Sequence, residues 1–203
     1  MLGLPRSTEV NRRVPKEKLY ANAALTPQLR DMIKSQIESV TWRNKLAEST
    51  IGIGSGESVN EIQVFEMLLR QRGLDRRILP VIARAIPYKI LFFLVFDGEV
   101  QAWMEASGTF YNTGWLPLDG FMLKVEGLDL DAVYANMVRQ VAGGRLGSEG
   151  GIDEAVARDK RRREVEREIA VLEKRLVRER QFNRQVEMSG ELKGLKKELE
   201  GSE

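Results

Sequence analysis

The chain has 203 residues, 42% of them hydrophobic, and its 32 Lys and Arg residues nearly balance its 30 Asp and Glu residues. It contains no cysteine and no histidine, which excludes a cysteine nucleophile, a zinc site of Cys and His ligands, a Ser-His-Asp triad and a histidine general base. The balance of charge gives no overall field toward nucleic acid, so such binding would need a local patch.

The sequence does not predict membrane association. The first residues, Met1-Leu-Gly-Leu-Pro-Arg6, lack the basic and apolar regions of a signal peptide. The longest apolar run, Ile90 to Phe96, is far too short to span a bilayer. The absence of cysteine also fits a reducing compartment. We therefore expect a cytoplasmic protein without membrane contact.

Residues 2–22 are mixed and basic, with Pro5 and Pro15 as breakers, and predict an irregular arm with one short helix. Thr26-Pro27 then favours a helix start, because a hydroxyl N-cap and a first-turn proline are both typical there. The apolar residues that follow at helical spacing are Leu29, Met32, Ile33, Ile37 and Val40. A strand is expected over Val40–Leu46.

The stretch Ile51–Glu57 has glycine at every second position from Gly52 to Gly56. Consecutive free N–H groups in such a loop could cradle a phosphate. However, no Gly-Lys-Ser/Thr follows, and the dinucleotide fingerprint does not fit either. A short strand and a tight turn are therefore the favoured interpretation.

The segment Glu61–Arg70 predicts a strand, because β-branched and aromatic residues are enriched near its start. Glu66 would then lie on an otherwise apolar face, where it should pair with a base or lie at a sheet edge. A helix is expected from Asp75 or later, since Pro80 is tolerated only in a first turn, and Pro87 ends it. This strand–helix–strand order predicts a crossover between parallel strands.

The segment Lys89–Phe96, the turn Asp97-Gly98 and the segment Glu99–Glu105 predict a β-hairpin, because Asp-Gly tolerates positive φ at both turn positions. The first strand is apolar on both faces, so it should lie inside a sheet. The second strand alternates, with Trp103 on its polar face. One face of this second strand should therefore meet solvent or a partner.

Two further strands are expected after this hairpin, over Thr109–Leu116 and Phe121–Val125. Asp129 or Asp131 should then cap a helix. The apolar residues at helical spacing in that helix are Leu130, Val133, Tyr134, Met137, Val138 and Val141.

Residues 143–151 contain five glycines and predict a flexible linker. We therefore expect an α+β domain over residues 1–142, the linker, and a helical region over residues 152–203. Val165, Ile169, Leu172 and Leu176 form a heptad-like seam in that region. Because later leucines are out of phase with this seam, an antiparallel hairpin that turns near residues 181–184 is favoured. The alternative is one long helix that forms a homodimer.

Two surfaces are candidates for binding. Nucleic acid could contact the basic cluster formed by Arg158, Lys160, Arg161, Arg162 and Arg163. Interleaved acidic residues make a solvated helix face the more common interpretation of such a cluster. Partner proteins could contact the seam residues Val165, Ile169, Leu172 and Leu176, or the aromatic residues Trp103 and Trp115.

The acidic residues Glu57, Glu61 and Glu66 are the only candidates for catalysis, since carboxylates that converge on Mg²⁺ could hydrolyse a phosphodiester. Glu61-Ile-Gln63 resembles the acidic-x-Lys/Gln signature of restriction-type nucleases, although no upstream aspartate partner is identifiable. Structural acidic residues in strands are more common than catalytic ones. No cofactor or metal is expected outside this nuclease alternative.

Four segments resemble one bacterial family of unknown function. They are Leu2-Gly-Leu-Pro-Arg-Ser-Thr8, Glu61-Ile-Gln-Val-Phe-Glu66, Ala85-Ile-Pro-Tyr88 and Gln181-Phe-Asn-Arg184. Members of that family look like small proteins encoded beside DNA methyltransferases and helicases of restriction-modification type. The resemblance implies a role in phage defence or DNA processing, and it implies no particular catalytic residue.

The sequence thus predicts an α+β fold, with a mixed sheet and packed helices, followed by a coiled-coil-like helical hairpin. The favoured function is that of a non-catalytic accessory protein that binds a helicase or methyltransferase partner and also contacts DNA. The alternative is a Mg²⁺-dependent nuclease that uses carboxylates of the central sheet.

Overall fold

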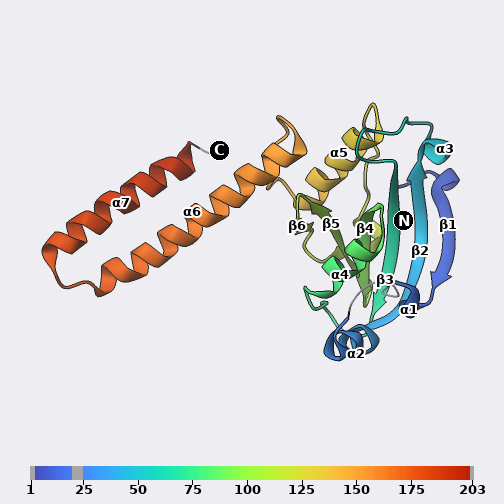
Figure 1. Cartoon of the computed structure of the whole chain (residues 1–203), viewed down its shortest axis with the longest axis horizontal. Helices are drawn as coiled ribbons and strands as arrows, with labels where there is room; N and C mark the ends of the chain where they lie inside the picture. The colour runs from blue at the N-terminus through green and yellow to red at the C-terminus, as the bar shows by residue number, and fades with distance from the viewer. Residues whose placement is uncertain (1–2, 20–24, 202–203) are drawn as a thin grey trace. The chain divides into compact units, whose positions relative to one another are not determined.

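The computed structural model describes residues 3–19 and 25–201. The chain forms two compact units, residues 1–145 and residues 146–203. The division falls inside the glycine-rich stretch that was expected to be a linker. The first unit is an α+β fold, as predicted, and the second contains two helices (Figure 1). Among the described residues, no helix combines the length and apolar composition needed to cross a membrane.

The first unit contains a mixed sheet of seven strands in the order β1-β2-β3-β4-β5-β6, with β7 paired to β5 (Figure 1). The strands are β1 (Glu9–Val14), β2 (Ile37–Ala47), β3 (Glu61–Leu69), β4 (Lys89–Phe96), β5 (Glu99–Ala106), β6 (Thr109–Asn112) and β7 (Leu116–Pro117). The helices are η1 (Arg6–Thr8), α1 (Lys16–Leu19), α2 (Pro27–Gln36), α3 (Glu48–Ile51), α4 (Ile78–Ala85), η2 (Leu118–Gly120) and α5 (Leu130–Ala142).

Strand β4 lies between β3 and β5, so it is an interior strand as predicted. It pairs parallel to β3, which confirms the crossover through α4, and antiparallel to β5. Asp97 and Gly98 both have positive φ, 47° and 75°, and close the β4–β5 hairpin. A two-residue turn of this kind matches the right-handed twist of the strands it joins.

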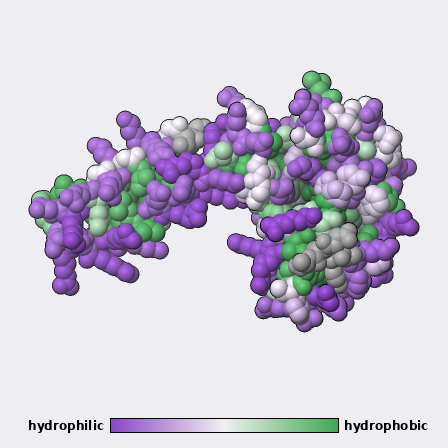
Figure 2. Space-filling model, viewed as in Figure 1, coloured by the Kyte–Doolittle hydropathy of each residue, from purple (hydrophilic) through white to green (hydrophobic). Residues whose placement is uncertain are grey.

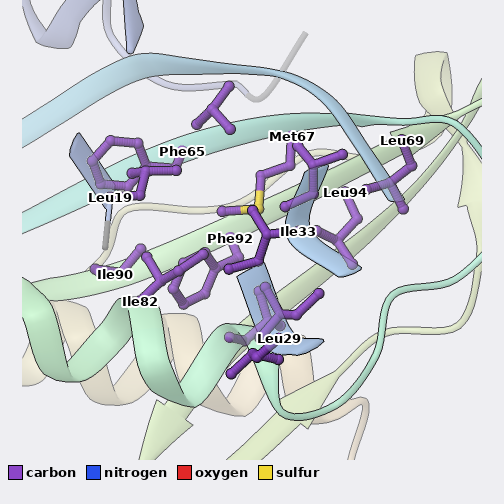
Figure 3. Packing of buried hydrophobic residues seen from close by; sticks show 14 residues of the cluster. Leu19, Leu29, Ile33, Phe65, Met67, Leu69, Ile82, Ile90, Phe92 and Leu94 are labelled. Atoms are coloured by element: carbon purple, nitrogen blue, oxygen red, sulfur yellow. The ribbon is translucent and has the colours of Figure 1, made fainter. Parts of the chain in front are cut away.

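Both faces of β4 are covered by apolar side chains. On one face, α2 and α4 contribute to a cluster centred on Ile33, Met67 and Phe92 (Figure 3). On the other face, Phe93 packs on Phe121 with ring centroids 5.3 Å apart. Helix α5 packs against β5 and β6. Residues that alternate along β4 thus belong to different halves of the core, as expected for a strand with a side-chain period of two.

The N-terminal arm was expected to be irregular with one short helix. The short helix is confirmed as α1, but the expected irregular part includes a strand. This strand, β1, pairs with β2 at the sheet edge and carries Arg12 and Arg13. A polar edge strand has no alternation of apolar and polar residues in its sequence. It is therefore recognised only from its pairing with β2 in the folded chain. Residues 2 and 20–22 of the predicted arm lie outside the described part of the chain.

The expected strand Phe121–Val125 is also absent from the described structure. This segment is irregular, yet Phe121 and Leu123 are buried. The side-chain amide of Gln140 in α5 bonds both the N–H and the carbonyl of Lys124, each at 2.9 Å. A side chain thereby supplies the backbone hydrogen bonds that a neighbouring strand would otherwise provide.

The expected strand Thr109–Leu116 is shorter than predicted. Strand β6 ends at Asn112, although the backbone N–H of Thr113 still donates to the carbonyl of Ala102 in β5 at 3.1 Å, and strand pairing with β5 resumes at β7. Between these two strands, the side-chain hydroxyl of Thr113 accepts a hydrogen bond from the N–H of Ala102 at 3.1 Å. Pairing along β5 is therefore interrupted and then resumed.

The glycine-rich loop holds a carboxylate of its own chain. The expected short strand does not form in this loop: α3 ends at Ile51, and Gly54 makes only an isolated bridge with Asp129. The carboxylate of Asp131, in the first turn of α5, accepts backbone hydrogen bonds from Glu57 and Val59, both at 2.8 Å, and from Ser58. A Cβ at Gly56 would overlap this carboxyl group, so glycine is required there. Asp129 is the residue that caps α5, through Ala132.

We predict that Asp131→Asn lowers the free energy of unfolding by about 1–2 kcal/mol, because the amide accepts these N–H groups less well than the carboxylate. Urea unfolding followed by circular dichroism measures this change. Asp119→Asn, at an exposed residue of η2, serves as the matched control and should leave stability unchanged. Equal stability of the two variants would show that the Asp131 contacts contribute little.

Candidate functional site

The second unit is a helical hairpin of α6 (Ile152–Arg178) and α7 (Phe182–Glu200), as predicted (Figure 1). The alternative prediction of a single long helix is wrong, because the backbone leaves helical geometry at Glu179 (ψ 135°) and at Gln181 (ψ 117°). The turn lies at Glu179–Gln181, slightly before the expected position. The side-chain amide of Gln185 bonds the Glu179 carbonyl at 2.7 Å and ties α7 to the turn.

The predicted apolar seam lies along α6. Val165 and Ile169 are buried, and Leu172 and Leu176 are half-buried. Helix α7 packs against α6 within this unit, and its half-buried apolar residues are Met188, Leu192, Leu195 and Leu199. Because these residues recur at helical spacing, they provide the apolar face that the seam requires. The seam is therefore engaged within the hairpin, which reduces the area that it can offer to a partner.

The basic cluster is balanced by nearby carboxylates. Arg161 bonds Glu198 of α7 at 2.8 Å and Glu164 at 3.1 Å, and these contacts hold the pKa of Arg161 above its ordinary value. Asp159 is buried and lies 2.8 Å from both Arg162 and Arg163.

The remaining two cluster residues lie at the surface. Arg158 donates to the Glu149 carbonyl at 2.9 Å, and Lys160 is exposed. Binding of nucleic acid by this cluster stays a prediction. Phosphate would have to compete with the existing ion pairs, so a structural role for the cluster is favoured.

The hairpin turn is organised by one acidic side chain. The Glu179 carboxylate accepts the N–H groups of Arg180 at 2.8 Å and of Gln181 at 2.9 Å. The bond from Gln181 and then the bond from Arg180 lower the pKa of Glu179 below its ordinary value. Glu179 thereby binds the free amide groups that precede α7.

Apolar side chains are exposed around this turn. Val177, in the last turn of α6, is 87% exposed, and Phe182, the first residue of α7, is 75% exposed. Val186 is 55% exposed and follows Phe182 by four residues, so the two lie on the same side of α7. We call these three residues the tip patch. Figure 2 shows hydrophobic colour at this end of the hairpin.

The two tryptophans expected to contact a partner are partly buried. Trp103 and Trp115 both pack against the core cluster of the first unit. The indole N–H of Trp103 donates to Gln101 at 2.9 Å, and the guanidinium of Arg72 lies 5.5 Å from the ring centre of Trp115. Much of the surface of both indole rings is therefore in contact with residues of the first unit. Contact with a partner through these residues stays a prediction.

The three candidate catalytic carboxylates do not converge. Glu61 lies 2.6 Å from Lys45 and accepts from Gln63 at 2.7 Å. Glu66 lies on the opposite face of β3, five positions along, and pairs with Arg43 at 3.5 Å. Glu57 is in the loop held by Asp131.

Within residues 3–19 and 25–201, no group of three acidic residues is placed to hold a metal ion. The expectation that these three carboxylates could share a Mg²⁺ ion is therefore wrong. The expected pairing of Glu66 with a base is confirmed.

Sequence reasoning did not select the tip patch. Its members lie out of phase with the seam, and Phe182 was noticed only within the family motif Gln181-Phe-Asn-Arg184. The available signal was an aromatic residue beside a predicted turn, where polar residues are usual.

We predict that the Glu179 carboxyl titrates below its ordinary pKa of 4.5. Because the pKa is lowered in the folded chain, the stability from this contact is complete above pH 4.5 and is lost as pH falls through the lower value. Amide chemical shifts of Arg180 and Gln181, followed by NMR against pH, report this titration. The titration should vanish in Glu179→Gln and persist in Glu187→Gln, a change at an exposed residue of α7. A Glu179 pKa at or above the ordinary value would contradict the expectation.

We also predict that Glu61→Gln lowers the free energy of unfolding by about 1–3 kcal/mol, because it leaves Lys45 without its carboxylate. Glu66→Gln, at a longer and more exposed ion pair, should cost less than about 1 kcal/mol. The bond to Glu61 raises the pKa of Lys45. Its stabilisation is therefore present below the ordinary value of 10.5 and is lost as pH rises through the folded value. Denaturant unfolding at neutral and alkaline pH tests both expectations, and equal losses in the two variants would contradict them.

Comparisons with curated proteins and with solved structures found no match to this chain. The model of one family matches residues 2–199, and the description of that family is Domain of unknown function (DUF4391). The expected likeness to a family of unknown function is thereby confirmed, whereas the restriction-type gene neighbourhood stays a prediction. Since the match covers nearly the whole sequence, the chain belongs to the DUF4391 family.

Proposed function

We propose that this chain is a non-catalytic accessory protein of a bacterial restriction or phage-defence system. Its helical hairpin binds a protein partner, a helicase or methyltransferase subunit, through the tip patch. The observation that carries the proposal is the exposure of Val177, Phe182 and Val186 around one turn. Large apolar side chains gathered at the surface are typical of protein interaction sites.

The composition of the tip supports a protein partner. Phe182 offers an aromatic anchor, and aromatic side chains often dominate binding energy at the centre of an interface. Charged residues, Arg178, Arg180 and Arg184, adjoin the patch in the sequence and would form a polar rim around it. The Glu179 contacts fix the turn before binding, which lowers the entropic cost of association.

The alternative function, a Mg²⁺-dependent nuclease, receives no support from the positions of Glu57, Glu61 and Glu66. DNA contact remains part of the proposal only through the basic cluster. A titration of DNA binding against salt measures how many phosphates the protein contacts.

We predict that Phe182→Glu weakens binding to the partner by at least about tenfold, because burial of an aromatic anchor contributes roughly 2 kcal/mol or more. Surface plasmon resonance measures this change with a helicase and a methyltransferase of the restriction-modification type from the same organism. Leu128→Glu is the matched control, since Leu128 is 97% exposed and lies in the other unit. The control should bind like the unchanged protein. Unaltered binding by Phe182→Glu, or no binding of either partner to the unchanged protein, would contradict the proposal.

A further inference from the structure

A cavity of about 300 Å³ opens in the first unit where β4 begins and β5 ends. One wall is apolar and comes from the end of α4 and the residues after it, namely Ala83, Ile86, Pro87 and Ile90. The polar residues Ser58, Tyr88, Lys89 and Glu105 also line the cavity. An apolar wall with a few convergent polar groups is the usual construction of a small-molecule site.

Three of these polar groups are hydrogen-bond donors. In the described part of the chain, the hydroxyls of Ser58 and Tyr88 have no hydrogen-bond partner, although Tyr88 also lies near the charge of Lys45. The ammonium group of Lys89 has no carboxylate within ion-pair distance among the described residues. This arrangement differs from that of Lys45, whose charge Glu61 already neutralises. The cavity therefore has one positive charge and two hydroxyls available to an incoming group.

Contacts with neighbouring residues hold Lys89 and Ser58 in place. The Lys89 ammonium lies 5.0 Å from the centre of the Tyr134 ring, a cation–π contact that fixes the side chain without neutralising it. The hydroxyl of Tyr134 in turn donates to the Glu105 carbonyl. The backbone of Ser58 is held by Asp131. Such prior placement lowers the entropic cost of binding.

Glu105, the acidic residue in the cavity lining, forms a hydrogen bond within its own chain. The Glu105 carboxylate accepts a hydrogen bond from the N–H of Gly108 in the β5–β6 turn. No salt bridge joins Glu105 to Lys89 among the residues that the structure describes. Among the residues that line the cavity, Lys89 carries the positive charge to which an anionic group would bind.

We propose that this cavity binds a small organic anion, with its carboxylate or phosphate group at Lys89, Tyr88 and Ser58 and a short apolar body along Ile86 and Ile90. The ammonium group and the two hydroxyls supply charge-assisted hydrogen bonds to the anionic group. The apolar body excludes water from the wall formed after α4. This site lies in a different unit from the tip patch, so it is independent of the proposed partner binding.

The test uses phenylacetate and phenyl phosphate as probes, with neutral phenylacetamide for comparison, and follows backbone amide shifts of the full chain by NMR. At least one anion should shift the amides of Ser58 and of residues 86–90 in a saturable way, and the amide probe should bind about tenfold more weakly because it lacks the charge. The phenylacetate and phenyl phosphate arms distinguish a carboxylate ligand from a phosphate ligand.

Lys89→Met should weaken anion binding about tenfold while leaving phenylacetamide unchanged. Lys124→Met is the matched control, since it removes an exposed charge from a loop outside the cavity. Ser58→Ala, which keeps the backbone bonds to Asp131, should weaken binding less than Lys89→Met. Equal binding of anions and amide, retention of binding in Lys89→Met, or no saturable shift at millimolar probe would each overturn the proposal.

Discussion

The fold of the first unit depends on the burial of β4 on both faces. An interior strand of this kind needs a strand on each side to satisfy its backbone and a helical layer on each face to cover its side chains. Strands β3 and β5 meet the first requirement, and α2 and α4 on one side and α5 on the other meet the second. Phe92 and Phe93 show this most directly, because neighbouring residues of one strand enter separate halves of the core.

Carboxylates of this protein act mainly as structural partners. Asp131 holds the loop before β3, Glu61 neutralises Lys45, and Glu179 orders the hairpin turn. Each of them accepts hydrogen bonds from, or forms an ion pair with, donors of its own chain. Their contacts within the chain are consistent with the lack of a cluster of three carboxylates near the sheet in the part of the chain that the structure describes.

The two units differ in how their apolar surface is used. The first unit covers a large core and leaves a cavity whose lysine is not neutralised. The hairpin has only a narrow seam, and it exposes Val177, Phe182 and Val186 at its turn. Since two helices can bury only one face of each other, the remaining apolar residues stay available for binding. The proposed partner site and the proposed anion site therefore arise from different physical causes.

The sequence by itself determined the interior strand, its Asp-Gly turn, the parallel crossover and the helical hairpin, because period, turn chemistry and phase are local properties of the chain. Tertiary structure alone decided the polar edge strand β1, the irregular segment held by Gln140, and the occupation of the glycine-rich loop by Asp131. It also decided the separation of Glu61 from Glu66 and the unneutralised charge of Lys89. These features depend on contacts between residues that are far apart in the sequence, and a local sequence pattern does not show which of those residues come into contact.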